Sequence, residues 1–388
     1  MIDFENTNIA FQNKSNRDLK RAYFLFNTMA RPFMVKAGKL FMQIALATGL
    51  PLKWIVRPTV YKQFVGGETI EACDPVVRSM AEYNVKSILD YSVEGKENPE
   101  DIQAALDETI RTIENAANNE NIPFAVFKST AFARSKFLEK ASSDQKLTNK
   151  EHTELNDFRI RIDTLCRNAY KNNVPILIDA EEVCYQYIID EVARDMMKKY
   201  NREKAIVFNT LQMYRWDRLD FLENEYEIAQ KEGFHYGAKF VRGAYMEKER
   251  ERAQKYGYLS PIHLDKAATD RDYNDALKFS VDNIEKIAIF NGTHNERSCL
   301  YLVELMDQHN IAKDDERIYF SQLYGMSDHI SYNLTNAGYN VAKYLPYGAV
   351  KNVMPYLIRR AEENTSVAGQ TSRELKLIKK ELKRRKNK

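Results

Sequence analysis

The chain has 388 residues, 44% of them hydrophobic, so it can bury a large core in one big domain or in a domain with an appendage. Its 58 Lys and Arg residues nearly balance 55 Asp and Glu residues, and the net charge of +3 gives no reason to expect a nucleic-acid partner. Four scattered cysteines fit reduced thiols, and six histidines without paired spacing predict no metal site.

The first 80 residues carry helical patterns without strands, so we expect 1–80 to form a helical arm or cap. The polar start at 1–5 does not have the features of a secretory signal. The most apolar stretch, from Leu40 to Val56, is interrupted by polar residues and is too short for a bilayer span, which needs about 20 apolar residues. It fits a core helix or a segment at an interface.

Eight short segments rich in Val, Ile, Phe or Tyr alternate with polar, helix-forming stretches, so we expect parallel strands joined by crossover helices. Eight such units favour a (β/α)8 TIM-type barrel over 81–370, and a doubly wound sheet is the alternative. With no GxGxxG motif, a classical dinucleotide-binding turn is not expected. The expected strands are 87–92, 124–130, 175–181, 205–213, 238–245, 286–294, 317–325 and 341–348.

The C-terminal residues 371–388 form a basic amphipathic pattern. We expect a solvated helical tail, with peripheral membrane contact as the functional alternative for such a segment.

Polar and charged residues gather where the expected strands end. Catalytic groups of a (β/α)8 barrel lie at this end of the strands. Charged side chains on a buried strand cost several kcal/mol unless they are paired or used, so this set predicts a site. In strand order the set contains Asp90, Glu94, Lys128, Asp179, Gln212, Lys239, Arg242, His294, Gln322 and Tyr344.

A helical pattern follows the last expected strand, with Tyr356, Arg359 and Arg360 at i, i+3 and i+4 on one face. Glu363 continues that face. An aromatic ring beside two guanidinium groups suits a small molecule with one apolar side and one carboxylate, because arginine can grip a carboxylate bidentately. An amphipathic surface helix with Arg–Glu pairs is the alternative.

Three motifs together resemble the proline dehydrogenase family in its single-function form. They are Tyr-x-Pro-x-Gly at 344–348 followed by Tyr-Leu-x-Arg-Arg-x-x-Glu-Asn at 356–364, Arg-Gly-Ala-Tyr at 242–245, and Thr-His-Asn at 293–295. The resemblance covers about 90–364. It implies a distorted barrel whose last helix lies over the active site, and oxidation of L-proline to 1-pyrroline-5-carboxylate, the first step of proline degradation to glutamate. Hydride would pass from proline C5 to N5 of FAD, and membrane quinone would take the electrons.

The resemblance also implies substrate-binding residues. Asp179 matches an acidic residue that pairs with Arg360, and Glu94 matches a gate residue that pairs with Arg359. Lys128 and Asp179 are expected to be catalytic together with Lys239. The remaining contacts would be Arg359, Arg360 and Lys128 at the proline carboxylate, and Leu323, Tyr344 and Tyr356 around the pyrrolidine ring.

For FAD, the resemblance implies a set that continues around the strand ends. Lys239 stands near flavin N5 where many bacterial members have arginine; the positive charge is kept, but a bidentate fork becomes a point donor. Lys266 and Thr269 would contact the adenosine or pyrophosphate part, and Glu363 the ribityl or ribose hydroxyls. The remaining matches are Ala180, Gln212, Arg242, Gly243, Ala244, Tyr245, Thr293 and His294.

Two other functions fit parts of the sequence. A related flavoenzyme oxidising hydroxyproline or another cyclic amine is one, although the bulky Tyr344 favours proline because hydroxyproline-oxidising relatives have a small residue there. A non-catalytic scaffold that docks through its helical arm and basic tail is the other, and it leaves the strand-end charges unexplained. We expect a cytoplasmic protein with peripheral contact at the inner face of the membrane, or a mitochondrial one in a eukaryote.

Overall fold

The computed structural model describes residues 2–31, 33–35, 37–38, 53–92, 97–366 and 370–387, without the side chains of 53, 55 and 362–371. Most of the apolar stretch from Leu40 to Val56 therefore lies outside the described residues, as does Glu94. Glu363 belongs to a described helix, but its side chain is not described. Among the described residues, no helix is both long and apolar enough to cross a membrane.

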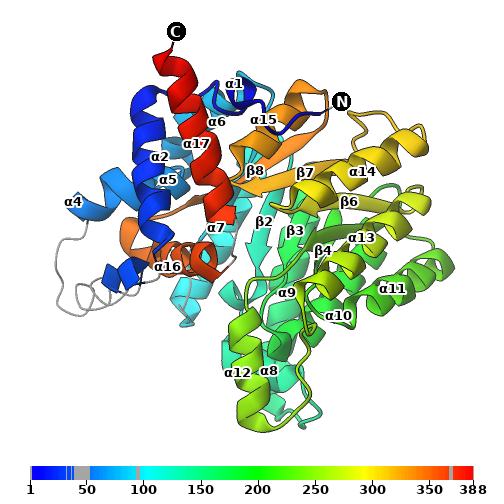
Figure 1. The fold of residues 1–388 in the computed structure, drawn as a ribbon. Helices are drawn as coiled ribbons and strands as arrows, with labels where there is room; N and C mark the ends of the chain where they lie inside the picture. Colours follow the sequence, from blue (N-terminus) through cyan, green and yellow to red (C-terminus); the bar gives the residue numbers. More distant parts are fainter. Residues whose placement is uncertain are drawn as a thin grey trace. The chain divides into compact units, whose positions relative to one another are not determined.

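The described residues form eight strands in one parallel sheet, ordered β1-β8-β7-β6-β5-β4-β3-β2 (Figure 1). The sheet curves into a nearly closed barrel, so the predicted (β/α)8 fold is confirmed and the doubly wound alternative is wrong. The strands are β1 (Lys86–Tyr91), β2 (Ala125–Lys128), β3 (Ile176–Asp179), β4 (Val207–Gln212), β5 (Tyr236–Val241), β6 (Ile287–Gly292), β7 (Ile318–Leu323) and β8 (Val341–Tyr347).

Strand β5 shows where the sequence prediction of boundaries fails. Its predicted range, 238–245, begins two residues late and extends four residues too far. The strand ends at Val241 because Gly243 turns the chain with φ at +127°. An L-residue rarely adopts this conformation, so the glycine has a specific structural role. The apolar residues around it concealed the turn.

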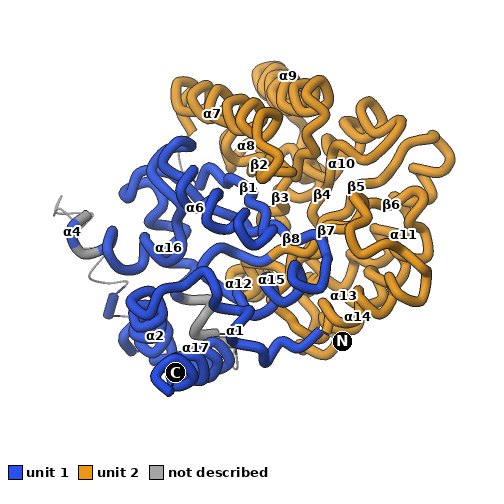
Figure 2. The backbone as a smooth tube through the Cα atoms, turned by 90° about the horizontal axis from the view of Figure 1, so that it is seen from above, with its two compact units in different colours: residues 1–94, 322–388 blue, residues 95–321 orange. Residues whose placement is uncertain are grey.

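The chain divides into two compact units, 1–94 with 322–388 and 95–321 (Figure 2). The helices of the first unit are α1 (Thr7–Ala10), α2 (Asn16–Met29), α4 (Lys53–Val56), α5 (Lys62–Phe64), α6 (Ile70–Ala81), α15 (Asp328–Asn336), α16 (Val350–Ser366) and α17 (Gln370–Lys386). Those of the second are α7 (Pro99–Ala117), α8 (Ser135–Ala141), α9 (Asn149–Lys171), α10 (Val183–Tyr200), α11 (Arg218–Glu232), α12 (Met246–Tyr256), α13 (Lys266–Asp282) and α14 (Glu296–Gln308).

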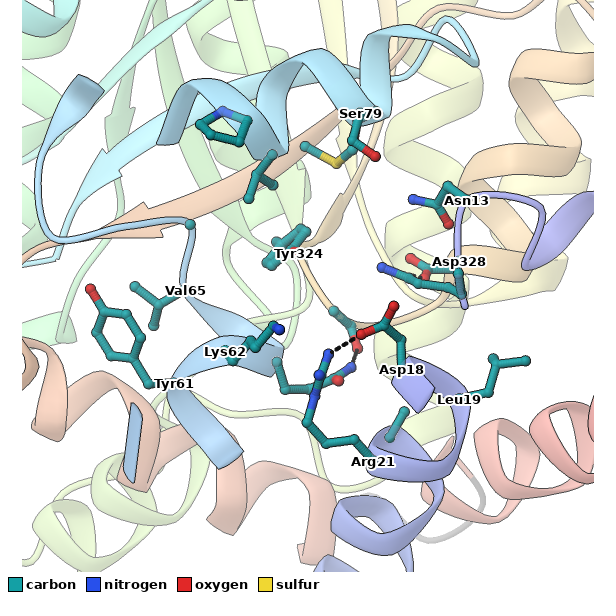
Figure 3. Close-up of a pocket in the computed structure, with 18 of the residues that line it drawn as sticks. Asn13, Asp18, Leu19, Arg21, Tyr61, Lys62, Val65, Ser79, Tyr324 and Asp328 are labelled. Carbon is teal, nitrogen blue, oxygen red and sulfur yellow. Dashed lines mark hydrogen bonds and ion pairs between the residues drawn. The ribbon is translucent and has the colours of Figure 1, made fainter. Parts of the chain in front are cut away.

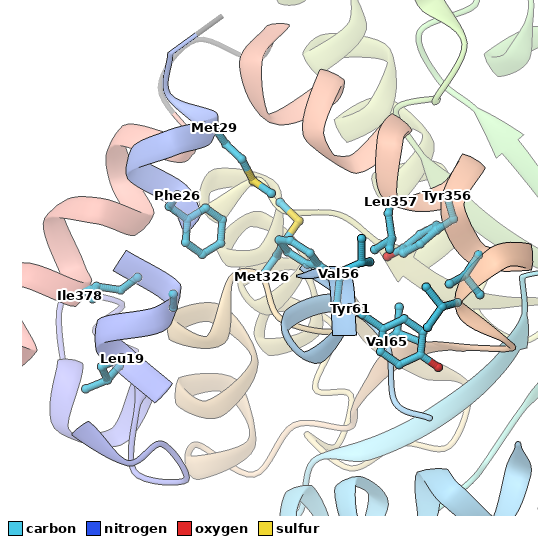
Figure 4. Close-up of a cluster of buried hydrophobic side chains, with 14 of the residues drawn as sticks. Leu19, Phe26, Met29, Val56, Tyr61, Val65, Met326, Tyr356, Leu357 and Ile378 are labelled. Atoms are coloured by element: carbon cyan, nitrogen blue, oxygen red, sulfur yellow. The ribbon is translucent and has the colours of Figure 1, made fainter. Parts of the chain in front are cut away.

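In the first unit, a hydrophobic cluster joins the N-terminal helices to the C-terminal ones (Figure 4). Helix α17 lies beside α2 and buries Leu377 and Ile378 completely or almost so. The same cluster contains Phe26 of α2 and Tyr356 of α16. The expectation of a solvated C-terminal tail is therefore wrong for this helix, because its apolar face packs in the cluster and Arg385 donates to the carbonyls of Phe11 and Lys14.

In the second unit, Phe124 packs edge-on against three aromatic rings, those of Phe208, Phe290 and Tyr319, with centroids 4.9–5.6 Å apart. Three of these residues come from the starts of strands or just before them, and Phe290 lies in the middle of β6. Edge-to-face packing of this kind adds about 0.5–1.5 kcal/mol per pair beyond burial. The amino-terminal end of this part of the barrel is thus filled with apolar side chains, which leaves the carboxyl ends of the strands for polar groups.

Candidate functional site

Asp179, at the end of β3, lies between two lysines of the second unit. The Nζ atom of Lys239 on β5 is 2.5 Å from Asp179 Oδ1, and Lys128 at the end of β2 is 3.8 Å from Oδ2. The carboxylate is 15% exposed, so it is neither fully buried nor free in solvent. All three residues predicted to be catalytic therefore come together, Lys128 and Asp179 as the last residues of their strands and Lys239 two residues before the end of β5.

Glu181, two residues after Asp179, connects the loops that follow β2, β3 and β4. Its buried carboxylate accepts hydrogen bonds from the backbone N–H and the hydroxyl of Thr130. Its backbone carbonyl accepts a 2.7 Å bond from the side chain of Gln212, a predicted cofactor residue. Glu181 is not among the predicted site residues; the available signal was the pair of acids, Glu181 and Glu182, at the end of the predicted strand 175–181.

Arg242 follows β5, and its guanidinium is fixed by three groups. Nε donates to Asp270 Oδ1 at 2.8 Å, Nη1 to the hydroxyl of Thr293 at 2.7 Å, and Nη2 to Ser298. Burial opposes ionisation of Asp270, but hydrogen bonds and charges from Lys266 and Arg242 outweigh it and lower the pKa of its carboxyl. Three residues predicted to lie at the cofactor, Arg242, Thr293 and Lys266, thus belong to one connected set.

The turn after Arg242 presents backbone amides beside these cations. Gly243 and Ala244 are exposed, and the Ala244 N–H contacts Gln212 Oε1 at 3.4 Å. A Cβ on Gly243 would lie 2.5 Å from the ring of Tyr214, so only glycine fits. An exposed glycine turn next to arginine and lysine suits a diphosphate, because backbone N–H groups and cations both bind phosphate oxygens. The donor set therefore fits a cofactor of the FAD type.

The other predicted cofactor residues of this unit lie in the loops after β3, β5 and β6 and in helix α13. Ala180 follows Asp179 directly, and Tyr245 precedes α12 as its N-cap residue. His294 is half-buried just beyond β6. Thr269 is buried within α13, and its hydroxyl is 3.4 Å from the Asp265 carbonyl, so it faces its own helix.

The first unit holds the predicted substrate residues other than Lys128. Tyr344 is 7% exposed on β8, and its carbonyl accepts a 2.8 Å bond from the N–H of Tyr324, the residue after Leu323. Tyr356 and Arg360 are largely buried on α16, and the Arg360 guanidinium lies 5.5 Å from the centre of the Tyr356 ring. The predicted shared helical face is confirmed for this pair, whereas the Arg360–Asp179 pair joins the two units and stays a prediction.

A cavity of about 500 Å³ lies elsewhere in the first unit (Figure 3). Its lining includes Lys14, Arg21, Tyr61, Lys62, Tyr324 and Asp328. Among the described residues that line it, none is a predicted site residue. Arg21 points toward Asp18, and its Nη2 atom lies 2.9 Å from Asp18 Oδ1. Some of the charged groups that line the cavity are therefore paired with one another.

Asp328, at the edge of this cavity, is the centre of a buried charge network. Lys343 Nζ is 2.7 Å from Asp328 Oδ1, and Lys14 Nζ is 3.5 Å from Oδ2. Burial opposes ionisation of Asp328, but the two lysines outweigh it and lower the pKa of its carboxyl. The network joins the N-terminal segment to α15 and β8, and sequence analysis had not predicted it.

A family model described as proline dehydrogenase matches residues 73–373, which is most of the chain. The chain belongs to the proline dehydrogenase family. It is 31% identical over 98% of its length to "Proline dehydrogenase 1, mitochondrial" of Dictyostelium discoideum, covering 74% of that protein. It is also 30% identical over 97% of its length to "Hydroxyproline dehydrogenase" of Xenopus laevis, covering 88% of that protein.

A solved structure supports the fold of this proline dehydrogenase family member. Proline utilization A (PutA) from Bdellovibrio bacteriovorus, inactivated by N-propargylglycine, aligns with 93% of the chain at a TM-score of 0.73. The sequence identity is 21%, and the chain spans 38% of that longer protein. At this identity the likeness bears on the fold alone, and it agrees with the barrel described above.

Proposed function

We propose that this chain oxidises L-proline to 1-pyrroline-5-carboxylate with FAD as its cofactor and quinone as electron acceptor. Family membership supports a flavin-dependent oxidoreductase acting on proline. The observation that carries the proposal is the Asp179 carboxylate held between Lys128 and Lys239 at three strand ends of a family-type barrel. Idle charges at such positions would be costly.

In this proposal, the substrate carboxylate is held by Arg359 and Arg360, with Lys128 beside it. A charge-assisted, bidentate grip fixes the orientation of proline as well as adding affinity. Tyr344, Tyr356 and Leu323 enclose the pyrrolidine ring and exclude water from it. Orientation of this kind brings the reacting carbon close to its acceptor without the entropic cost of a free encounter.

The cofactor would be held by the predicted residues at and after strands β3 to β6 and by helix α16 (Val350–Ser366), which we call the closing helix. When bound, the flavin supplies the hydride acceptor. Lys239 keeps a positive charge at the cofactor, and Asp179 fixes the position of that lysine. The Gly243 backbone amide, with Arg242 and Lys266, would donate to the phosphates, and Ala244, whose N–H contacts Gln212, would lie beside them. The remaining proposed contacts are Ala180, Gln212, Tyr245, Thr269, Thr293, His294 and Glu363.

Delivery of electrons to quinone implies contact with a membrane surface, because quinones reside in the bilayer. We therefore propose peripheral membrane association, in the cytoplasm at the inner face of the membrane or in mitochondria. Sedimentation with liposomes tests this part of the proposal. Protein that stays in the supernatant with quinone-loaded vesicles would argue against it.

Anaerobic titration tests the catalytic proposal directly. Purified protein should be yellow, and its flavin absorbance should bleach on addition of L-proline without oxygen. Colourless protein that takes up no FAD would contradict the cofactor assignment. Yellow protein that does not bleach with L-proline would contradict the substrate assignment.

Oxidation of hydroxyproline is the second candidate, because one relative that matches nearly the whole chain is named for that activity. Tyr344 argues against it, since a buried, bulky ring leaves less room for a hydroxyl on the substrate. Initial rates on the two amino acids separate the candidates. If Tyr344 encloses the ring, Tyr344→Ser should narrow the preference for proline, and an unchanged ratio of rates would remove that role.

A further inference from the structure

Glu249, near the start of α12, lies where the loops following β3, β4 and β5 meet. Its side chain is 1% exposed. Oε1 accepts a 2.8 Å hydrogen bond from the backbone N–H of Val183, the first residue of α10. Its own N–H donates to the carbonyl of Tyr245 at 2.9 Å. One residue therefore connects the start of α10 to the turn that follows β5.

The turn at 242–245 also rests on the loop after β4. Tyr214 donates its backbone N–H to the carbonyl of Arg242 at 2.8 Å, and its ring occupies the space next to Gly243. Arg215, the next residue, exerts a favourable charge effect on Glu249. The turn 242–245 therefore packs against Tyr214 in the loop after β4 and is bonded to Glu249 of α12, which in turn binds the start of α10.

The chemistry of Glu249 favours a hydrogen-bonding role over a role as a charge. Oε2 makes no hydrogen bond to any described residue. Burial, followed by the nearby Glu182 carboxylate, raises the pKa of Glu249 despite the bond from Val183 and the neighbouring arginines. A buried carboxylate whose ionised form is disfavoured can be replaced by an amide of the same shape at little cost.

We propose that Glu249 is a positioning residue that fixes the turn 242–245 relative to the loop after β3, and so sets the site for the cofactor diphosphate. The inference rests on the proposed function, because it takes this turn as part of the FAD site. Glu249 acts through Val183 and Tyr245 and contacts neither cofactor nor substrate. Loss of the connection should loosen FAD while leaving proline recognition unchanged.

Two variants break the same hydrogen bond from opposite sides. Glu249→Ala removes the acceptor, and Val183→Pro removes the donor N–H while keeping Glu249. Proline is well accepted at the first position of a helix, and the preceding Glu182 already has the extended conformation that proline requires, with φ −63° and ψ 146°. Val183→Pro therefore tests the connection even if Glu249→Ala fails to fold.

Release of FAD from the holoenzyme after dilution, followed by flavin fluorescence, is the readout. Both variants should speed release by about tenfold or more, and the double variant should add little, since one bond is lost in each case. Glu249→Gln should stay within about threefold of wild type because its amide oxygen keeps the acceptor. The KM for proline should not change in any of them.

Lys248→Met is the matched control. Lys248 is 63% exposed and pairs with Glu182 at 2.6 Å. It therefore connects α12 to the start of α10 through an ion pair at the surface. Exposed pairs contribute little, and release should stay within about twofold of wild type. Val183→Pro releasing FAD at the wild-type rate, or Glu249→Gln behaving like Glu249→Ala, would overturn the inference alone. Wild-type protein without FAD would overturn the proposed function and this inference with it.

Discussion

Asp179 in the second unit and Asp328 in the first each lie between two lysines. Asp179 contacts Lys128 and Lys239 from strand ends, and its side chain is 15% exposed. Asp328 contacts Lys14 and Lys343, and its side chain is 8% exposed. The same three charges thus occur once at the strand ends of the barrel and once beside the cavity of the first unit. Position in the fold, rather than composition, separates the candidate site from a structural charge network.

The largest expected effect follows from breaking the charge network around Asp328. Asp328→Asn leaves Lys343 buried without its counter-charge, and removing one partner of a buried pair costs about 3–5 kcal/mol. We expect the free energy of unfolding, measured by urea denaturation at pH 7, to fall by about this amount. Asp74→Asn, which breaks an exposed pair with Arg78 at 3.8 Å, serves as the control and should change it by less than about 1 kcal/mol.

Asp179→Asn should lower activity strongly and stability only modestly. Lys128 is 18% exposed and can be solvated, whereas Lys239 is only 6% exposed. We therefore expect the free energy of unfolding to fall by about 2 kcal/mol, less than for Asp328→Asn. Because Lys128 and Lys239 lose their orientation, kcat/KM for proline with a soluble dye acceptor should fall about a hundredfold, equivalent to about 2.7 kcal/mol. If Asp179→Asn were as destabilising as Asp328→Asn and kept its activity, the distinction between the two clusters would be wrong.

The sequence predicted one cluster and missed the other for a physical reason. Lys128 and Asp179 both lie near the carboxyl ends of predicted strands, and parallel strands bring these ends to one edge, so their proximity follows from the fold. Lys239 was placed among the catalytic residues by the family resemblance. Lys14 precedes α2 and Lys343 lies on β8, and only the packing of the terminal helices brings that N-terminal lysine to Asp328. No periodicity in the sequence carries that information.

The same limit applies to the turn after β5. The motif at 242–245 was selected by resemblance, but its support by Glu249 and Tyr214 depends on backbone bonds between separate loops. The presence of eight strands was predictable from the sequence, because each strand has a local apolar pattern. Connections between loops have no local pattern, and for that reason they could be found only in the folded structure.

Variants of the closing helix test whether its two arginines bind the substrate carboxylate. Arg359→Met and Arg360→Met each remove a charged donor but keep an apolar stem. Charge-assisted hydrogen bonds are worth about 1.5–3 kcal/mol, so each variant should raise KM for proline by at least about tenfold. Steady-state kinetics measures this, with Arg384→Met on α17, paired with Glu381 at 2.7 Å, as a control that leaves KM unchanged. Unchanged saturation in both variants would remove the carboxylate role.

The smallest effect concerns Glu374, the second acid of the charge network around Asp328. Its carboxylate accepts a hydrogen bond from the Ser327 N–H, and burial, with a smaller contribution from Asp328, raises its pKa above the ordinary value of 4.5. A raised folded-state pKa means that the folded chain holds a proton that the unfolded chain has lost. Stability therefore falls as pH rises from 4.5 through the folded-state pKa.

Glu374→Gln keeps the acceptor for Ser327 but cannot ionise, so it should escape this loss. We expect the variant to be more stable than wild type at pH 8 by on the order of 1 kcal/mol, with the difference vanishing near pH 4. At pH 8 Asp328 is ionised, because its pKa is lowered below the ordinary value, so the network keeps one negative charge in both proteins at that pH. Urea denaturation at the two pH values measures the difference. A variant less stable than wild type at pH 8 would show that the network needs both carboxylates charged.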